Sequence, residues 1–558
     1  MTRLLTLLLL LVMATGGLLL AMRPVAEMAL VDYFPEDTLI FIEKNHAASA
    51  PGQGLLDQVA RTFAPTVWRQ LTPLVAGNET LLAEARRLAA AGEALLNRPV
   101  VSSLLEHGTA FALLPEGAGQ SDFVPSRQWL VAVPVDDQVS AQGFEHLFGH
   151  IRSRQTLGYQ GEVLVRLAVD DGQDFLYWRH GKVALVACEQ ALLQRCIDRN
   201  LQRLTRDVAA LSTNSAYARL HRISQDRADI FCWLDLDGLS QRTPLVREID
   251  DASGGLLPRT LAFSTHAASE TSRTMRVGAL VGREAASAFV ARRHLPPPVP
   301  HPLIEPMPQQ TKLALWTNWF DLKDLWDWLR QQAGDEVAAL MTSIGQQASE
   351  ATGKSLDDFF DVFGGEFGVM ITGQPVAHQA PRLLGGLVVT VRDRPAAAAM
   401  IARMVAGLQV ITVKASDLDI SSVLLVGGLL QPAYALLERH LILADNAELV
   451  EAVRRQLLHG DGTDGGATGE PDLARRQGNV AVFLRVGEMI ERLTPLLTLA
   501  GREMDERNRM ASPEAYRLMR EIGPPALAAL RNLATARFHG ALAEDILFME
   551  LEYTLQRD

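Results

Sequence analysis

A proline-rich block constrains the fold of this chain more than any other stretch. Seven of the thirteen residues from Pro296 to Pro308 are proline. Because proline fixes φ and lacks a backbone N–H donor, neither a helix nor a central strand can run through the block. The block therefore predicts a stiff, extended connector. A chain of 558 residues is too long for one hydrophobic core, so we expect the connector to separate two folded parts.

The sequence before the block and the sequence after it follow one pattern. Residues 97–114 align with residues 353–370 without a gap, so that Gly108 meets Gly364. Strand-like and helix-like segments further along align at nearly the same spacing. Such self-similarity at a fixed offset is the sign of a duplicated module.

We therefore predict an α+β fold class with two tandem related domains. Each domain would be a mostly antiparallel sheet packed with helices, and one N-terminal transmembrane helix would precede them. The first domain is expected at residues 31–294, the proline-rich linker at 295–310 and the second domain at 311–558.

The amino-terminal residues 1–30 predict a membrane anchor. Leu4 to Met22 is a run of nineteen residues without a charge, and at about 1.5 Å per residue it is long enough to cross a bilayer. We expect an uncleaved signal anchor. The alternative is a cleaved signal peptide whose small-residue site is Ala14-Thr15-Gly16. The anchor predicts a single-pass protein of the inner (cytoplasmic) membrane, with the bulk of the chain periplasmic or extracytoplasmic.

Charge and cysteine content narrow the functional class. The formal net charge of -12 opposes the phosphate contacts that dominate nucleic-acid affinity, so no nucleic-acid partner is expected. The three cysteines, Cys188, Cys196 and Cys232, are too few to staple an exported protein of this size. We expect them to be buried as small apolar residues.

Two short phrases resemble a known family. One is the opening phrase from Phe34 to Leu39, and the other runs from Ala351 to Val369 with a Gly-x-x-x-x-Asp turn and a Gly-Gly-Glu strand entry. They resemble the signature of an uncharacterised bacterial envelope family, domain-of-unknown-function family three-three-five-two. The first half departs from it, since Thr109-Ala110 stands where the second half has Gly365-Glu366. The resemblance implies an envelope location and this architecture, and it adds no site residue.

Two acidic residues are the candidate catalytic groups. Asp358 and Glu366 could form an acid–base pair. At the aligned positions the first half has Ser102 and Ala110, so any such chemistry would belong to the second half alone. Acidic residues at the start of a helix are also favoured by the helix dipole, which would explain Asp358 without catalysis.

Two histidines are the candidate metal ligands. His146 and His150 would share one face of a helix predicted over residues 142–153, which suits zinc. The order of the neighbouring glutamate fits no helical zinc-protease motif, so a solvent-facing helix edge is the alternative. The sequence also has no complete phosphate-binding loop and no dinucleotide fingerprint, and no cofactor is expected.

The predicted function is binding rather than catalysis. The two aligned halves share no set of polar residues that could form a catalytic site, which suggests that the fold of the module was kept and not a chemical activity. We expect a membrane-anchored extracytoplasmic binding or scaffold protein that uses a domain surface or groove. Its partner would be an unknown envelope protein, a lipid or a polymer. The alternatives are a hydrolase that uses the carboxylates of the second half, and a carrier of lipid or another hydrophobic ligand.

Overall fold

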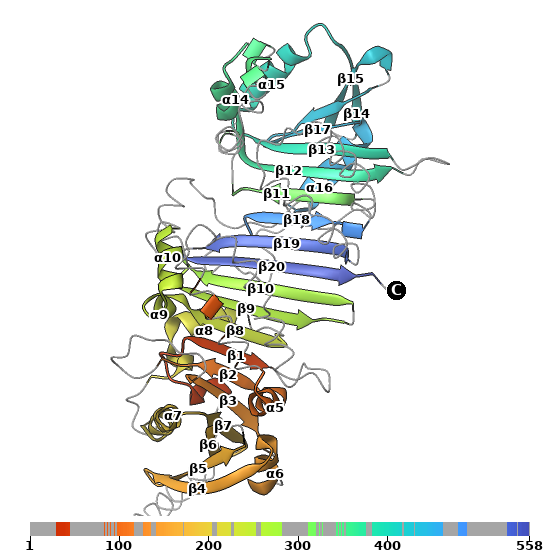
Figure 1. The fold of residues 1–558 in the computed structure, drawn as a ribbon. Helices are drawn as coiled ribbons and strands as arrows, with labels where there is room; N and C mark the ends of the chain where they lie inside the picture. The colour runs from red at the N-terminus through yellow and green to blue at the C-terminus, as the bar shows by residue number, and fades with distance from the viewer. Residues whose placement is uncertain are drawn as a thin grey trace, which may run out of the picture. The chain divides into compact units, whose positions relative to one another are not determined.

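In a computed structural model the chain forms two compact units, unit 1 (Met1–Ala262) and unit 2 (Phe263–Asp558) (Figure 1). Apart from single positions within 83–94 and 323–350, the residues that the structure describes are 29–44, 97–115, 127–135, 141–170, 172–202, 209–224, 228–252, 258–269, 271–281, 311–319, 353–374, 382–415, 418–428, 430–460, 478–487, 533–543 and 545–556.

Unit 1 is built on an antiparallel sheet in the order β4-β5-β6-β7-β3-β2-β1-β8. Three consecutive hairpins join β4 to β7, so strands adjacent in sequence are adjacent in space there. The strands are β1 (Ile40–Lys44), β2 (Ala110–Leu113), β3 (Trp129–Pro134), β4 (Ile151–Tyr159), β5 (Glu162–Val169), β6 (Asp174–His180), β7 (Val183–Ala187) and β8 (Ile230–Asp235).

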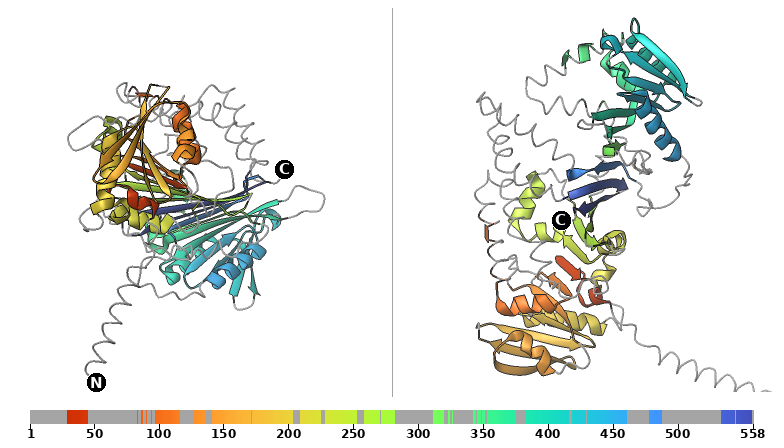
Figure 2. Two further views of the ribbon diagram at one scale, coloured as in Figure 1. Left: turned by 90° about the horizontal axis from the view of Figure 1, so that it is seen from below. Right: turned by 90° about the vertical axis from the view of Figure 1, so that its right-hand side faces the viewer.

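Short helices cover this sheet, and Figures 1 and 2 show α5 and α7 on opposite faces of it. Helix α5 begins with Pro99 in its first turn, where the missing N–H costs no hydrogen bond. It ends at Gly108, where a Cβ would lie 2.8 Å from the carbonyl oxygen of Leu104. The described helices are η1 (Leu30–Tyr33), α5 (Pro99–His107), α6 (Ala141–Glu145), η3 (His146–Phe148), α7 (Gln190–Gln202), η4 (Leu211–Thr213), α8 (Ser215–Ser224), α9 (Leu236–Ser240) and α10 (Pro244–Ala252).

Unit 2 is also antiparallel, in the order β14-β15-β16-β17-β13-β12-β11-β18-β19-β20-β10-β9. Strand β9 begins three residues before the unit boundary. The strands are β9 (Thr260–Ala267), β10 (Ser272–Leu280), β11 (Thr311–Thr317), β12 (Phe363–Gln374), β13 (Arg382–Val391), β14 (Gln409–Ala415), β15 (Leu418–Leu424), β16 (Ala433–Leu436), β17 (His440–Ala444), β18 (Val480–Leu484), β19 (Leu533–Ala543) and β20 (Ile546–Leu555).

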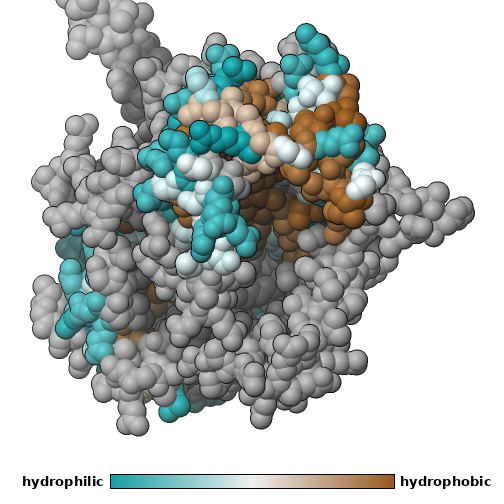
Figure 3. Space-filling view, turned by 90° about the horizontal axis from the view of Figure 1, so that it is seen from above, coloured by the Kyte–Doolittle hydropathy of each residue, from teal (hydrophilic) through white to brown (hydrophobic). Residues whose placement is uncertain are grey.

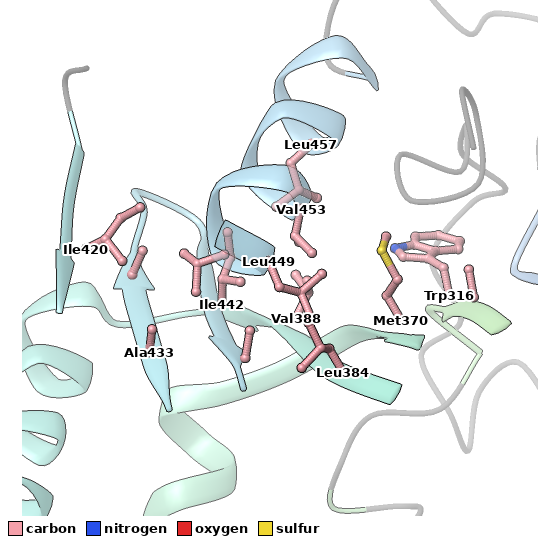
Figure 4. Close-up of a cluster of buried hydrophobic side chains, with 14 of the residues drawn as sticks. Trp316, Met370, Leu384, Val388, Ile420, Ala433, Ile442, Leu449, Val453 and Leu457 are labelled. Atoms are coloured by element: carbon pink, nitrogen blue, oxygen red, sulfur yellow. The ribbon is translucent and has the colours of Figure 1, made fainter. Parts of the chain in front are cut away.

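Helices cover both faces of the unit 2 sheet. Side chains alternate across a strand, so Val388 packs in one core cluster and Val389 in the other. The first cluster is covered by α16 and includes Trp316 and Met370 (Figure 4). The second lies under α14 and α15. The described helices are α14 (Leu356–Val362), α15 (Arg394–Met404), η5 (Val426–Gly428) and α16 (Ala447–Gly460).

The strand order of unit 1 recurs in unit 2. Adding ten to each strand number of the series β4-β5-β6-β7-β3-β2-β1-β8 gives the series β14-β15-β16-β17-β13-β12-β11-β18, which is the order found in unit 2. The segments aligned in the sequence occupy equivalent elements, α5 with β2 and α14 with β12. Equivalent strands can therefore be compared position by position.

Two strands that follow these series in the chain, β10 and β20, pair with each other inside unit 2. Strand β10 runs antiparallel to β20 over nine residues, centred on Arg276 opposite Glu550. The Arg276 Nε atom lies 2.6 Å from Glu550 Oε2, and the side chains are 27% and 16% exposed. The partly buried ion pair sits at the midpoint of the seam, where it favours this register.

Replacing Glu550 with glutamine should lower the free energy of unfolding of unit 2 by about 1 kcal/mol, because a partly buried cation loses its counter-charge. Chemical denaturation checks this value. In the Arg276→Met background the same replacement should cost much less. Equal losses in both backgrounds would show that the pair contributes nothing.

The fold class predicted from the sequence is wrong. The described residues form large, mostly antiparallel sheet in which strand outweighs helix, and β10, expected to close the first of two separate domains, pairs with β20. Hydrogen bonding between strands far apart in sequence leaves no periodic signal, so the seam could not be read from the residues. No helix in the described ranges is long and apolar enough to cross a membrane, and Leu4 to Met22 lies outside those ranges.

The helix predicted over residues 142–153 is also wrong. Helix α6 ends at Glu145 and a 3-10 turn follows to Phe148. Gly149, with φ of 71°, then redirects the backbone, since glycine accepts positive φ at little cost. Ile151 already begins β4. The glycine inside the predicted helix was the missed stop signal.

Candidate functional site

A group of buried and partly buried polar side chains in unit 1 has strongly shifted proton affinities. We call Glu43, Tyr217, His221, Ser224 and Trp233 the Glu43 cluster. Glu43 lies on β1, directly opposite Phe231 of β8. Since the register pairs residues on the same face of the sheet, Trp233 lies on that face as well.

Helix α8 covers this face of the sheet. Tyr217, His221 and Ser224 follow each other at helical spacing, so they form one stripe. The Tyr217 ring stacks on the His221 ring with centroids 5.0 Å apart and packs edge-on against Trp233 at 5.9 Å. The ring of Phe231 lies 4.8 Å from that of His221. The stripe is therefore an aromatic contact between helix and sheet.

Several polar atoms of the cluster have no hydrogen-bond partner among the residues that the structure describes. They are buried Tyr217 Oη, His221 Nε2, Ser224 Oγ and Trp233 Nε1. A buried donor or acceptor without a partner costs about 1–3 kcal/mol. No pattern in the sequence points to these residues, because β1, which carries Glu43, is far in the chain from α8 and β8.

Burial changes the proton affinities in this cluster. Burial raises the pKa of Glu43 to about 7 and lowers the pKa of His221 to about 4. The pKa of Tyr217 is raised, first by burial and then by the negative charges of Glu43 and Asp32. All three groups thus favour the neutral form, the direction that burial without a counter-charge produces. Of the three groups, only Glu43 has a pKa near neutral pH.

The predicted catalytic residue Asp358 caps a helix. Its Oδ2 accepts hydrogen bonds from Ser355 N at 3.0 Å and Ser355 Oγ at 2.7 Å, and Ser355 Oγ accepts one from Asp358 N at 3.1 Å. This is the reciprocal capping box at the start of α14. The hydrogen bonds from Ser355 lower the pKa of the exposed Asp358 carboxyl. The helix-terminus interpretation accounts for this residue.

The other predicted catalytic residue, Glu366, has a separate partner. It lies on β12, and its Oε1 is 3.2 Å from Nε2 of His440 on β17. The two side chains are 26% and 19% exposed. In the described part of unit 2 no hydrogen bond joins Glu366 to Asp358, so the two carboxylates do not form the expected pair. His440 was missed because the pairing of β13 with β17 is long-range.

The predicted metal ligands are not placed by a common helix. His146 lies in the 3-10 turn η3 and His150 lies beyond it, both exposed. No group of three or more metal-ligating side chains occurs among the residues described. The neighbouring Glu145 is buried, and it accepts a hydrogen bond from Tyr177 Oη at 2.6 Å and one from Arg154 Nε at 2.9 Å. The glutamate of this stretch therefore has a structural role.

A border strand of unit 2 exposes two apolar side chains. Strand β14 pairs with β15 and with no other described strand. Its side chains Ile411 and Val413 are 47% and 57% exposed. We call this strand with these two side chains the β14 edge. Figure 3 shows apolar side chains gathered on one side of the molecule. Other exposed apolar side chains of unit 2 are Met404, Leu408, Val426 and Leu430.

The equivalent strand of unit 1 is protected. Strand β4 pairs with β5 alone among the described strands, but its exposed positions carry arginines. Arg152 Nε lies 3.6 Å from Asp170, and Arg154 Nε lies 2.9 Å from Glu145. Charged side chains on a border strand oppose pairing with another chain. The β14 edge lacks this protection, apart from Lys414 at its end.

No family model, curated protein or solved structure matches this chain.

Proposed function

We propose that the protein is a non-enzymatic extracytoplasmic binding or scaffold protein, and that it binds an extended segment of an envelope protein at the β14 edge. The exposure of Ile411 and Val413 on a strand that pairs on one side carries the proposal. Exposed apolar border strands are normally avoided because they add further strands. The β14 edge is exposed and apolar although the equivalent strand β4 carries charged residues, so the β14 edge is suited to binding.

The chemistry of the edge favours a polypeptide as partner. A border strand offers backbone N–H and C=O groups, which an extended peptide satisfies by adding a strand. Ile411 and Val413 point to the same side of the sheet, so they would recognise apolar side chains at alternate positions. A lipid or a polysaccharide cannot pair with the backbone in this way. The separate engagement of Asp358 and Glu366 gives the hydrolase alternative no support.

Site-specific photo-cross-linking in intact cells tests the proposal. A photoreactive amino acid at Val413 is expected to give discrete protein adducts, whereas the same residue at Arg154, on the protected β4 border, is expected to give few. Mass spectrometry identifies the captured chains. Equal yields at both positions, or no adduct at Val413, would overturn the proposed function.

The extracytoplasmic location stays a prediction from the first thirty residues. Cell fractionation combined with protease protection is expected to place the bulk of the chain outside the cytoplasm, and a purely cytoplasmic distribution would contradict it.

A further inference from the structure

We infer that the segment bound at the β14 edge is the β14 edge of a second copy of this chain. Two copies would pair antiparallel about a two-fold axis through Thr412, joining the two sheets into one. The inference rests on the proposed function, because it names the partner of the same edge. It follows from the register that the strand allows, from its charge pattern and from the protection of β4.

The register follows from the alternation of side chains. When a strand pairs antiparallel with its own copy, opposed residues point to the same side, so the axis must pass through a residue and not between two residues. Gln409–Ala415 has seven residues, and Thr412 is its midpoint. An axis there pairs the whole strand. It also places Ile411 opposite Val413 of the second copy, which covers both exposed apolar side chains at once.

The charge pattern permits this pairing. Lys414 is the one charged residue of the strand. In the register centred on Thr412 it lies opposite Val410 of the second copy, so no like charges face each other. The neighbouring strand β15 already places an acidic residue next to this lysine, because Asp419 lies opposite Lys414. A partner therefore needs no complementary acid, and a second copy meets that condition.

The chain already uses the same kind of seam. Within unit 2, β10 and β20, the second strands after β8 and β18 in the chain, pair antiparallel about their midpoints. Pairing of equivalent border strands is thus compatible with the twist of these sheets. In the proposed seam Thr412 of both copies would hold the midpoint, where the internal seam has the Arg276–Glu550 ion pair, and the apolar Ile411–Val413 contacts would flank it.

The protected β4 strand would limit the assembly to two chains. An open border at both ends would allow repeated addition and a filament. Because arginines occupy the β4 border, each chain has one open apolar border among the described strands. Pairing through β14 covers this border in both chains, so the assembly stops at a symmetric dimer. A seam of seven residues buries little area, so we expect a dissociation constant on the order of micromolar.

Cross-linking of purified full-length protein at a single introduced cysteine tests the register. We choose a background with Cys188→Ser, because Cys188 is the partly exposed cysteine and the other two are buried. Thr412→Cys lies on the proposed axis, so a short bis-maleimide should convert most of the protein to a dimer. The control Gln155→Cys, at the middle of β4, should stay monomeric under the same conditions.

Sedimentation equilibrium provides a second measurement without cysteines. Val413→Lys brings like charges together near the axis and should weaken dimerisation at least tenfold. Val163→Lys is the matched control, because Val163 is a valine with the same 57% exposure on β5 of unit 1, and it should leave the dimer unchanged.

The outcomes separate this inference from the proposed function. A monomer at all concentrations, together with adducts of another protein at Val413 in cells, overturns the dimer and keeps the binding function. If the protein forms neither a dimer in solution nor protein adducts at Val413 in cells, the inferred dimer and the proposed binding function are both wrong. A dimer that cross-links at Gln155→Cys and not at Thr412→Cys contradicts the seam. Selective cross-linking at Thr412→Cys with loss of the dimer in Val413→Lys supports it.

Discussion

Replacing Glu43 with glutamine should stabilise unit 1 at pH 8 by about 3 kcal/mol relative to the unaltered protein, and should change it little at pH 4. Burial raises the pKa of Glu43 from 4.5 to about 7. The folded chain therefore binds a proton more tightly than the unfolded chain. The contribution of Glu43 is fully present below pH 4.5 and is lost as the pH rises through 7. Glutamine keeps the shape and cannot ionise.

Urea denaturation at several pH values, with hydrogen exchange of β1 amides as the local readout, measures this effect. The control is Glu106→Gln, which changes an exposed carboxylate on α5. It should leave the pH dependence of the free energy of unfolding of unit 1 unchanged. If the Glu43→Gln protein loses stability between pH 5 and pH 8 as steeply as the unaltered protein, folding does not raise the pKa of Glu43 and the prediction is wrong.

Replacing Glu145 with alanine should destabilise unit 1 by about 2–3 kcal/mol, because the buried Tyr177 hydroxyl loses its acceptor. Tyr177 Oη donates to Glu145 at 2.6 Å, and Tyr177 is 4% exposed. The half-exposed Arg154 adds a smaller loss, since screened ion pairs contribute little. Thermal or chemical denaturation gives the difference.

Two further variants separate the hydrogen bond from other effects of the Glu145 replacement. Glu145→Gln retains an acceptor and should cost less than half as much. In the Tyr177→Phe background there is no hydroxyl to leave unpaired, so Glu145→Ala should have a much smaller effect. An undiminished loss in that background would mean that packing, and not the hydrogen bond, accounts for the cost.

Local features of the fold were predictable from short patterns. Pro99 at a helix start, the Ser355–Asp358 capping box and the β-branched runs of β12 and β13 act through nearest neighbours in the chain. The helix-terminus interpretation of Asp358 rested on the same local physics. By contrast, the helix expected through His150 failed because Gly149 ends it, and a single residue outweighed the apolar spacing on both sides.

The candidate sites were much less predictable. Glu43, Phe231 and Tyr217 meet because β1 pairs with β8 and α8 packs over both. None of these residues is unusual in its own stretch of sequence, and the change in the pKa of Glu43 comes from burial, which sequence does not display. The β14 edge also looked like an ordinary strand. Its exposure depends on which strands stand beside it.

The sequence by itself determined that strands and short helices alternate and that two stretches of the chain follow one pattern, because these properties depend on residues close together. Only the tertiary structure decided that β10 pairs with β20, that Glu43 lies opposite Phe231 and that β14 lies open at a border. These depend on contacts between distant residues, whose free energy arises from burial and hydrogen bonding that no local pattern encodes.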